Sequence, residues 1–174
     1  VIAVFESETL EEYQVSRLLV FVNDDQSTAA SYNLEQAQIA IGNGGITGSG
    51  LFEGTQNKSD LVPEQQTDFI FTVIAEETGF LGSVFILTLI GLLLFRIWRI
   101  GRLAEDAFGL LISVGIFSMI LFQTFQSVGM STGIMPITGI PLPLISYGGS
   151  SIVTTFLGLG LVESVHMRRH ERSN

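Results

Sequence analysis

Cysteine is absent from this 174-residue chain, and lysine and arginine together number only eight. Without cysteine there can be no disulfide bond, no thiolate nucleophile and no cysteine-ligated metal. Basic residues are scarcest in residues 1–68, where only Arg17 and Lys58 accompany eleven acidic residues. Because nucleic-acid-binding surfaces are rich in basic residues, this imbalance excludes a nucleic-acid partner.

Charge of either sign is missing from the 56 residues between Ala107 and Val162. A transmembrane helix needs about 20 apolar residues, so this run is long enough for two spans. It cannot be one continuous helix, because proline removes a backbone donor and clashes with the preceding turn. The residues that interrupt it are Pro136, Pro141, Pro143, Gly148 and Gly149. The sequence therefore predicts two spans joined by an uncharged, structured loop at 131–149.

The overall composition indicates an integral membrane protein. Hydrophobic residues make up 47% of the chain, charged residues only 14%, and the mean hydropathy is +0.48. The chain does not begin with methionine, and residues 1–5 are predicted to end a preceding transmembrane helix. We interpret it as a piece of a longer all-α membrane protein.

Arginine clusters fix the predicted topology. The three expected spans cover residues 69–97, 107–130 and 150–166, separated by a short connection at 98–106 and the 131–149 loop. The first and third spans end in basic clusters, namely Arg96, Arg99 and Arg102, and Arg168, Arg169 and Arg172. The positive-inside rule makes residues 98–106 and the tail at 167–174 cytoplasmic. Residues 6–68 and the loop then share the extracytoplasmic side.

The extracytoplasmic segment is expected to contain short helices and a glycine-rich stretch. One helix is predicted over 10–22, along the membrane surface, and another over 34–41, capped by Asn33 and stopped by Gly42. The stretch at 42–50, GNGGITGSG, lacks the spacing of a phosphate-binding fingerprint. It has two interpretations: a flexible surface loop, or backbone amides that approach a diphosphate.

Asp68 marks the entrance to the first span and has two interpretations. A carboxylate that loses part of its hydration at a membrane boundary becomes a better general base. Alternatively, it is an ordinary acidic residue favoured by the dipole at a helix N-terminus. If the segment is helical, Glu64, Asp68 and Thr72 form one polar stripe.

Four further ionisable residues lie within or beside the predicted spans. Glu76 and Glu77 are deep enough to face a bundle interior or a polar cavity, either as structural groups or as part of a site. His166 and His170 have the spacing of a metal pair on a helix, but contact with lipid headgroups among the neighbouring arginines explains them more simply. No metal site is predicted.

Several segments closely resemble the SEDS family (shape, elongation, division and sporulation), which are polytopic bacterial cell-wall polymerases. The matching segments are YNLEQAQIAIGNGGITGSG (32–50), VPEQQTDFIFTVIAEETGFLG (62–82) and ITGIPLPLISYGGSS (137–151). The resemblance covers nearly the whole chain, but only the C-terminal part of a family pattern of about ten helices. The segments FEGTQ (52–56) and VGM (128–130) are more similar to the RodA-type than to the FtsW-type branch. Ser127 departs from the pattern, which has asparagine there.

The resemblance implies an inverting peptidoglycan glycosyltransferase that polymerises lipid II for cell-wall elongation and cell shape. Asp68 falls in the family's TDFIF motif and is the implied catalytic base. Implied substrate contacts are Glu64, which would orient Asp68 or the acceptor, Lys58 and Arg17 at the diphosphate, and Ser146 and Tyr147 lining the cavity. Glu76, Glu77, Pro141, Pro143, Gly148 and Gly149 are expected to be structural or to shape the cavity.

The resemblance also implies partners and a location. The expected partner is a class B penicillin-binding protein, a transpeptidase, in the bacterial inner membrane among membrane lipids. A divalent cation such as Mg²⁺ or Mn²⁺ would help neutralise charge, although no ligand set can be identified. Two alternatives remain: a lipid II flippase, and a non-catalytic scaffold for the transpeptidase. The 174-residue fragment alone is expected to be inactive.

Overall fold

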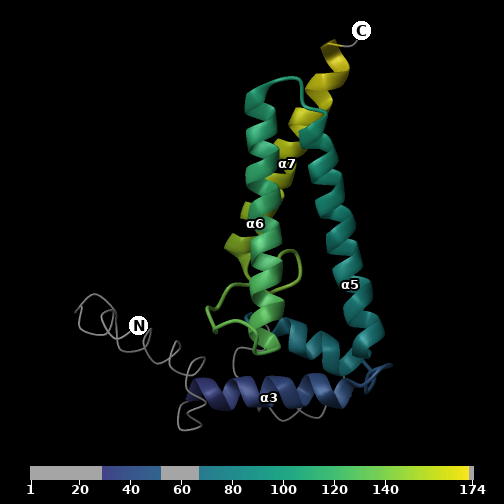
Figure 1. Cartoon of the computed structure of the whole chain (residues 1–174), viewed down its shortest axis with the longest axis vertical. Helices are drawn as coiled ribbons and strands as arrows, with labels where there is room; N and C mark the ends of the chain where they lie inside the picture. The colour runs from purple at the N-terminus through teal and green to yellow at the C-terminus, as the bar shows by residue number, and fades with distance from the viewer. Residues whose placement is uncertain (1–28, 52–66, 173–174) are drawn as a thin grey trace, which may run out of the picture.

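The computed structural model describes residues 29–51 and 67–172, and this part of the chain is helical without strands. It contains four helices: α3 (Ala29–Gly44), α5 (Ile70–Arg102), α6 (Ala107–Ser131) and α7 (Gly149–Arg172). In Figure 1, α6, α7 and most of α5 stand side by side, and α3 lies across one end of them. The ends of α5 and α7 lie together at the other end of the bundle.

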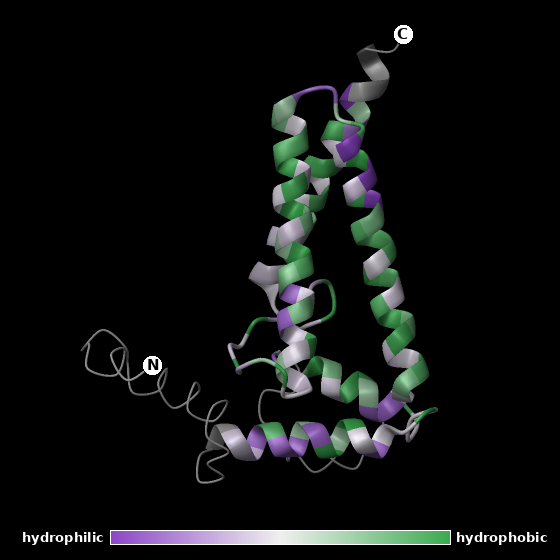
Figure 2. Cartoon of the chain, in the orientation of Figure 1, coloured by the Kyte–Doolittle hydropathy of each residue, from purple (hydrophilic) through white to green (hydrophobic). Residues whose placement is uncertain are grey.

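Three of these helices are long and apolar enough to cross a membrane: Ile70–Arg102, Ala107–Ser131 and Gly149–Arg168. The predicted all-α membrane fold with three spans is confirmed. Figure 2 shows hydrophobic residues along the three standing helices and hydrophilic ones on α3 and near the ends of α5 and α7. Only 22% of the most apolar part of α5 is buried, so most of its apolar surface faces outward.

Helix α6 is the centre of the bundle, because small residues let both neighbours approach it closely. An added Cβ on Gly101 of α5 would lie 2.9 Å from the Ser113 side chain of α6. On the other side, an added Cβ on Gly158 of α7 would lie 2.9 Å from Ile116. Glycine at such contacts allows close van der Waals packing between membrane helices. The apolar core between the helices contains Phe71, Ile90, Leu94, Ile97, Ile120, Leu142 and Val162.

Helix α5 is sharply kinked at Gly79, whose φ of 68° and ψ of −164° belong to a region that only glycine occupies readily. The kink divides α5 into a short arm, residues 70–78, which packs with α3, and a long arm, residues 80–102. A regular helix would pair the amides of Phe80 and Leu81 with the carbonyls of Glu76 and Glu77. The kink breaks both of these pairs.

The glycine-rich stretch supplies replacement partners for all four backbone groups. Residues 45–50 and 76–81 together form what we call the clasp. Its four hydrogen bonds run from Phe80 N to Gly45 O (2.9 Å), Leu81 N to Ile46 O (3.2 Å), Ser49 N to Glu76 O (3.0 Å) and Gly50 N to Glu77 O (3.1 Å). The Ser49 hydroxyl also donates to the Glu76 carbonyl at 2.9 Å. The kink therefore leaves none of these groups without a partner.

The clasp bears on both interpretations of the glycine-rich stretch. The segment lies at the surface, as expected, but its backbone pairs with α5 on both sides of the kink. The amides of Ser49 and Gly50 donate to carbonyls of α5, so they do not point at a diphosphate. Glycine is needed because a Cβ on Gly48 would collide with the Glu77 carbonyl, and one on Gly44 with the Ala75 carbonyl. These glycines allow two backbone segments to touch.

Four predicted helix boundaries were wrong: both ends of the 34–41 helix, the end of the first span, and the end of the third, where α7 continues past residue 166 to Arg172. Helix α3 is longer than the predicted 34–41 helix, so Asn33 lies inside it and Gly42 does not stop it. A glycine inside a helix costs only about 1 kcal/mol relative to alanine, which packing of α3 against α5 can offset. Helix α5 also continues past Ile97 to Arg102, so most of the predicted 98–106 connection is helical. The helix predicted over 10–22 lies outside the described residues.

Candidate active site

Asp68 lies in a turn immediately before the short arm of α5 and is half-buried. The N-cap of the helix is the next residue, Phe69, which makes no side-chain capping bond. Asp68 is therefore outside the helix and does not share a helical face with Thr72, and Glu64, the third member of the predicted stripe, lies outside the described residues. Thr72 is instead buried at 2% exposure, and its hydroxyl has no hydrogen-bond partner among the described residues.

The carboxylate of Asp68 lies against the backbone of the loop between α6 and α7, residues 132–148, which we call the Pro/Gly loop. A Cβ added to Gly139 would lie 3.1 Å from Oδ2 of Asp68, and Gly139 has a φ of +72°. Only a residue without a side chain allows the loop to approach the carboxylate this closely in that conformation. The structure thus brings together Asp68 and the loop predicted to face it.

Apolar contacts hold Asp68 in this position. Phe69, 3% exposed, packs in a small cluster with Ala37 of α3 and Ile137 of the Pro/Gly loop. Three segments that are far apart in the sequence therefore meet at the residue next to Asp68. A hydrogen bond also connects α3 to the end of α6: the side-chain amide of Gln38 donates from Nε2 to the Thr132 carbonyl at 3.3 Å.

A hydrogen bond from α6 and a buried leucine order the Pro/Gly loop. Gln126 of α6, 4% exposed, donates its amide to the Pro136 carbonyl at 2.9 Å. Leu142, 1% exposed, inserts into the main core. Leu144 has a φ of +66° and is the only non-glycine residue with positive φ in the described ranges. That conformation is strained for a bulky residue, so the surrounding loop must hold it in place.

The predicted substrate residues of the loop have different environments. Ser146 is 3% exposed, and its hydroxyl accepts a hydrogen bond from the Leu142 amide at 2.8 Å, which closes a turn. Tyr147 is 75% exposed. Pro143 is buried, whereas Pro141 and Gly148 are half-buried and Gly149 starts α7. Ser146 therefore shapes the loop, and Tyr147 is the loop side chain most available to a ligand.

Glu76 and Glu77 lie at the end of the short arm, within the clasp, and not in the long arm that stands beside α6. Glu76 is 1% exposed and Glu77 is half-buried, and both interact with neighbouring groups. Their backbone carbonyls are clasp acceptors. These features favour the structural alternative for Glu76.

The other predicted ligands cannot be placed. Arg17, Lys58 and Glu64 lie outside the described residues. No group of three or more potential metal ligands occurs within residues 29–51 and 67–172. His166 lies at the opposite end of the bundle from Asp68, in a groove between α5 and α7.

Three residues at the Asp68 end of the bundle were not predicted as site residues. Gly139 and Gln126 position the Pro/Gly loop. The sequence did contain a signal for Gly139, because it lies between prolines in the ITGIP segment. Ser127 is completely buried on α6, and its hydroxyl has no hydrogen-bond partner among the described residues. The serine therefore makes no side-chain bond that would replace one made by asparagine.

Comparison with known proteins gives the relationship directly. The sequence profile of the FtsW/RodA/SpoVE proteins, described as cell cycle proteins, matches residues 1–171. The chain belongs to this family. Members of the FtsW/RodA/SpoVE family are the SEDS proteins, so the resemblance noted in the sequence is confirmed.

Relatives within the FtsW/RodA/SpoVE family are similar along nearly all of the chain. The peptidoglycan glycosyltransferase MrdB of Escherichia coli K12 is 38% identical over 161 residues, which are 92% of this chain and 44% of that protein. The peptidoglycan glycosyltransferase RodA of Treponema pallidum is 42% identical, over 92% of this chain and 37% of that protein. Stage V sporulation protein E of Bacillus subtilis is 40% identical, over 88% of this chain and 42% of that protein.

A solved structure has the same family fold. It describes a peptidoglycan synthase complex and the coordination of polymerization and crosslinking. One of its chains matches with a TM-score of 0.74 and 36% identity, over 92% of this chain and 43% of that chain. The FtsW/RodA/SpoVE chain described here thus spans less than half the length of the relatives it matches.

Proposed function

We propose that the intact protein containing this chain is a peptidoglycan glycosyltransferase that polymerises lipid II, with Asp68 as its general base. The observation that carries the proposal is the position of the Asp68 carboxylate. It is half-buried at the junction of α3, α5 and the Pro/Gly loop, with the loop backbone beside it at Gly139. The names of the relatives MrdB and RodA support the same activity.

The proposed reaction needs one proton acceptor. The 4-hydroxyl of the acceptor sugar attacks C1 of the donor glycan, a new glycosidic bond forms, and the bond from C1 to the lipid diphosphate breaks. Asp68 takes the hydroxyl proton, which makes the oxygen a stronger nucleophile. The leaving diphosphate needs positive charge nearby, for which Arg17, Lys58 and a divalent cation are the candidates. Glu64 would orient Asp68 or the acceptor.

The proposed orientation puts this chemistry on the extracytoplasmic face of the bacterial inner membrane. Arg96, Arg99 and Arg102 lie at the end of the bundle opposite Asp68, and the end of α7 lies with them. The positive-inside rule makes the arginine end cytoplasmic and the Asp68 end extracytoplasmic. A class B penicillin-binding protein is the proposed partner, supported by the solved synthase complex. The largely exposed apolar surfaces of α5 and α6 are the proposed docking region.

The test separates polymerisation from transport. The intact protein and its transpeptidase partner would be purified, placed in vesicles and supplied with labelled lipid II. We expect glycan polymers to accumulate when lipid II is present on the extracytoplasmic face only. Movement of lipid II between leaflets without polymer would instead identify a flippase. Absence of both, with transpeptidase still bound, would identify a scaffold.

Gly139 offers a specific test of the site geometry. Alanine at this position would push the Asp68 carboxylate away from its present place, because the new Cβ would lie 3.1 Å from Oδ2. We expect polymerisation by Gly139→Ala to fall by up to about tenfold, since the carboxylate must shift by a few tenths of an ångström and a misplacement of 1 Å can cost about a hundredfold. The measurement is the initial rate of polymer formation with labelled lipid II.

Gly133→Ala is the matched control for Gly139→Ala. Gly133 lies in the same loop with a similar φ of +79°, but its added Cβ would meet the flexible end of Gln38 and not Asp68. Backbone strain should therefore be similar in both variants. Equal rates for the two variants would show that contact with Asp68 is not the reason Gly139 matters.

A further inference from the structure

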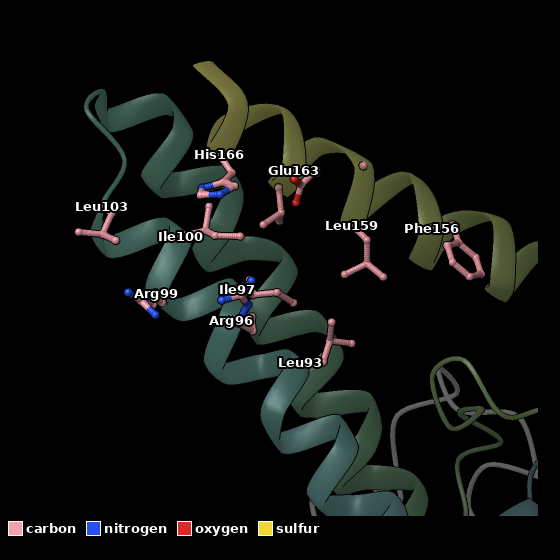
Figure 3. Close-up of a pocket in the computed structure, with 12 residues that line it drawn as sticks. Leu93, Arg96, Ile97, Arg99, Ile100, Leu103, Phe156, Leu159, Glu163 and His166 are labelled. Carbon is pink, nitrogen blue, oxygen red and sulfur yellow. The ribbon is translucent and has the colours of Figure 1, made fainter. Parts of the chain in front are cut away.

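A groove of about 790 Å³ lies between α5 and α7, at the end of the bundle opposite Asp68. Its apolar part is formed by Leu93 and Ile97 of α5 and by Phe156 and Leu159 of α7. Figure 3 shows these side chains projecting from the two helices toward the space between them. The groove takes no part in the site around Asp68.

Charged groups gather at one end of this groove. Arg96 and Arg99 come from α5, and Glu163 and His166 come from α7 (Figure 3). With His166 neutral the formal charge of these four side chains is +1. Arg96 and Arg99 are exposed and have no ion-pair partner within the described part of the chain. The groove is therefore apolar along the helices and cationic where they end.

We propose that this groove binds an anionic phospholipid, with its phosphate at Arg96 and Arg99 and an acyl chain along Leu93, Phe156 and Leu159. Basic pockets between transmembrane helices are typical sites for the headgroups of anionic lipids. Arginine suits a phosphate because its guanidinium can donate two parallel hydrogen bonds to the oxygens. This site is independent of the proposed polymerase activity.

Both ends of the groove contribute to this choice of ligand. A free phosphate would use the arginines but leave the apolar part uncovered. An uncharged helix would cover the apolar part but would separate two arginine charges from water, which is expensive in a membrane. A phospholipid anion matches both parts, and it is abundant where the helix ends meet the headgroup region.

The test measures lipid binding to the intact protein by native mass spectrometry in detergent. Dioleoylphosphatidylglycerol is compared with dioleoylphosphatidylcholine, which has the same chains and no net charge. We expect preferential retention of the anionic lipid, and about tenfold weaker retention by the double variant Arg96→Gln/Arg99→Gln. Equal retention of the two lipids, or no change in the double variant, would overturn the proposal.

Arg102→Gln is the matched control, because the Arg102 guanidinium lies 4.8 Å from the centroid of the Trp98 ring and does not line the groove. It should retain phosphatidylglycerol nearly as well as the unmodified protein. Thermal unfolding in lipid-free detergent checks that all variants are folded. An equal loss of retention in the control would show a general effect of positive charge and would contradict a specific site.

A photoreactive residue identifies what occupies the apolar part. With p-benzoylphenylalanine in place of Leu159, we expect illumination in membranes to give a mass increase equal to one phospholipid. A cross-link to another span of the same protein would show that a helix fills the groove. Competition by inorganic phosphate as effective as by the lipid would show that only the anion is recognised. Either result would overturn the proposal.

Discussion

Asp68→Asn is expected to reduce lipid II polymerisation by the intact protein about 10²- to 10⁴-fold, the usual contribution of a general base. Asparagine has nearly the same shape as aspartate but cannot accept the proton of the attacking hydroxyl. Asp68 is half-buried, and the side chain that anchors it in place is its neighbour Phe69. The substitution should therefore alter the rate without altering the fold. The measurement is the initial rate of polymer formation at saturating lipid II.

Glu105→Gln is the matched control for the loss of one carboxylate. Glu105 is exposed in the connection between α5 and α6, at the opposite end of the bundle. The Glu105→Gln variant should polymerise lipid II at the same rate as the unmodified protein. Binding of lipid II by Asp68→Asn should be retained, because the proposed role concerns proton transfer. Polymerisation by Asp68→Asn at the unmodified rate would rule out Asp68 as the base.

Gly79→Ala is expected to destabilise the protein by about 3–5 kcal/mol, the second large effect. Gly79 has φ and ψ values of 68° and −164°, which a residue with a Cβ adopts only under strain. The new Cβ would also collide with the Gly48 amide. We therefore expect the clasp to open and its four backbone hydrogen bonds to be lost. Thermal unfolding of the purified protein measures the effect.

Gly91→Ala provides the control on the same helix. A Cβ at Gly91 would have no atom within 4 Å, so alanine there should be neutral or stabilising by up to about 1 kcal/mol. Gly48→Ala should resemble Gly79→Ala, because its Cβ would collide with the Glu77 carbonyl from the other side of the clasp. If Gly79→Ala unfolded at the same temperature as Gly91→Ala, the clasp would contribute nothing to stability.

The three spans could be predicted because each one depends on local composition. Charge-free runs at 78–95 and 107–162, with arginine clusters beyond them, predict membrane-spanning helices whatever their neighbours are. The clasp could not be predicted in this way, since it pairs residues 45–50 with residues 76–81, which are far apart in the sequence. Gly79 also resembles any other glycine in an apolar helix. Its special conformation follows from a contact with Gly48 that only the structure reveals.

Part of the candidate site was accessible from the sequence, and part was not. Resemblance to SEDS proteins selected Asp68, and the topology placed the Pro/Gly loop at the same end of the bundle. The approach of Gly139 to the Asp68 carboxylate depends on the three-dimensional path of the loop and was not predicted. Ser146 was expected to line a cavity, yet its hydroxyl accepts the Leu142 amide, because a buried turn needs that acceptor.

The kink at Gly79 also makes the short arm of α5 a lever. The arm, residues 70–78, is about 13 Å long at 1.5 Å per residue, with the clasp at one end and Asp68 just beyond the other. Over that length, a change of about 5° in the angle at Gly79 displaces Asp68 by about 1 Å. The tilt of the long arm within the membrane and the location of the carboxylate are therefore mechanically linked through Gly79 and the clasp around it.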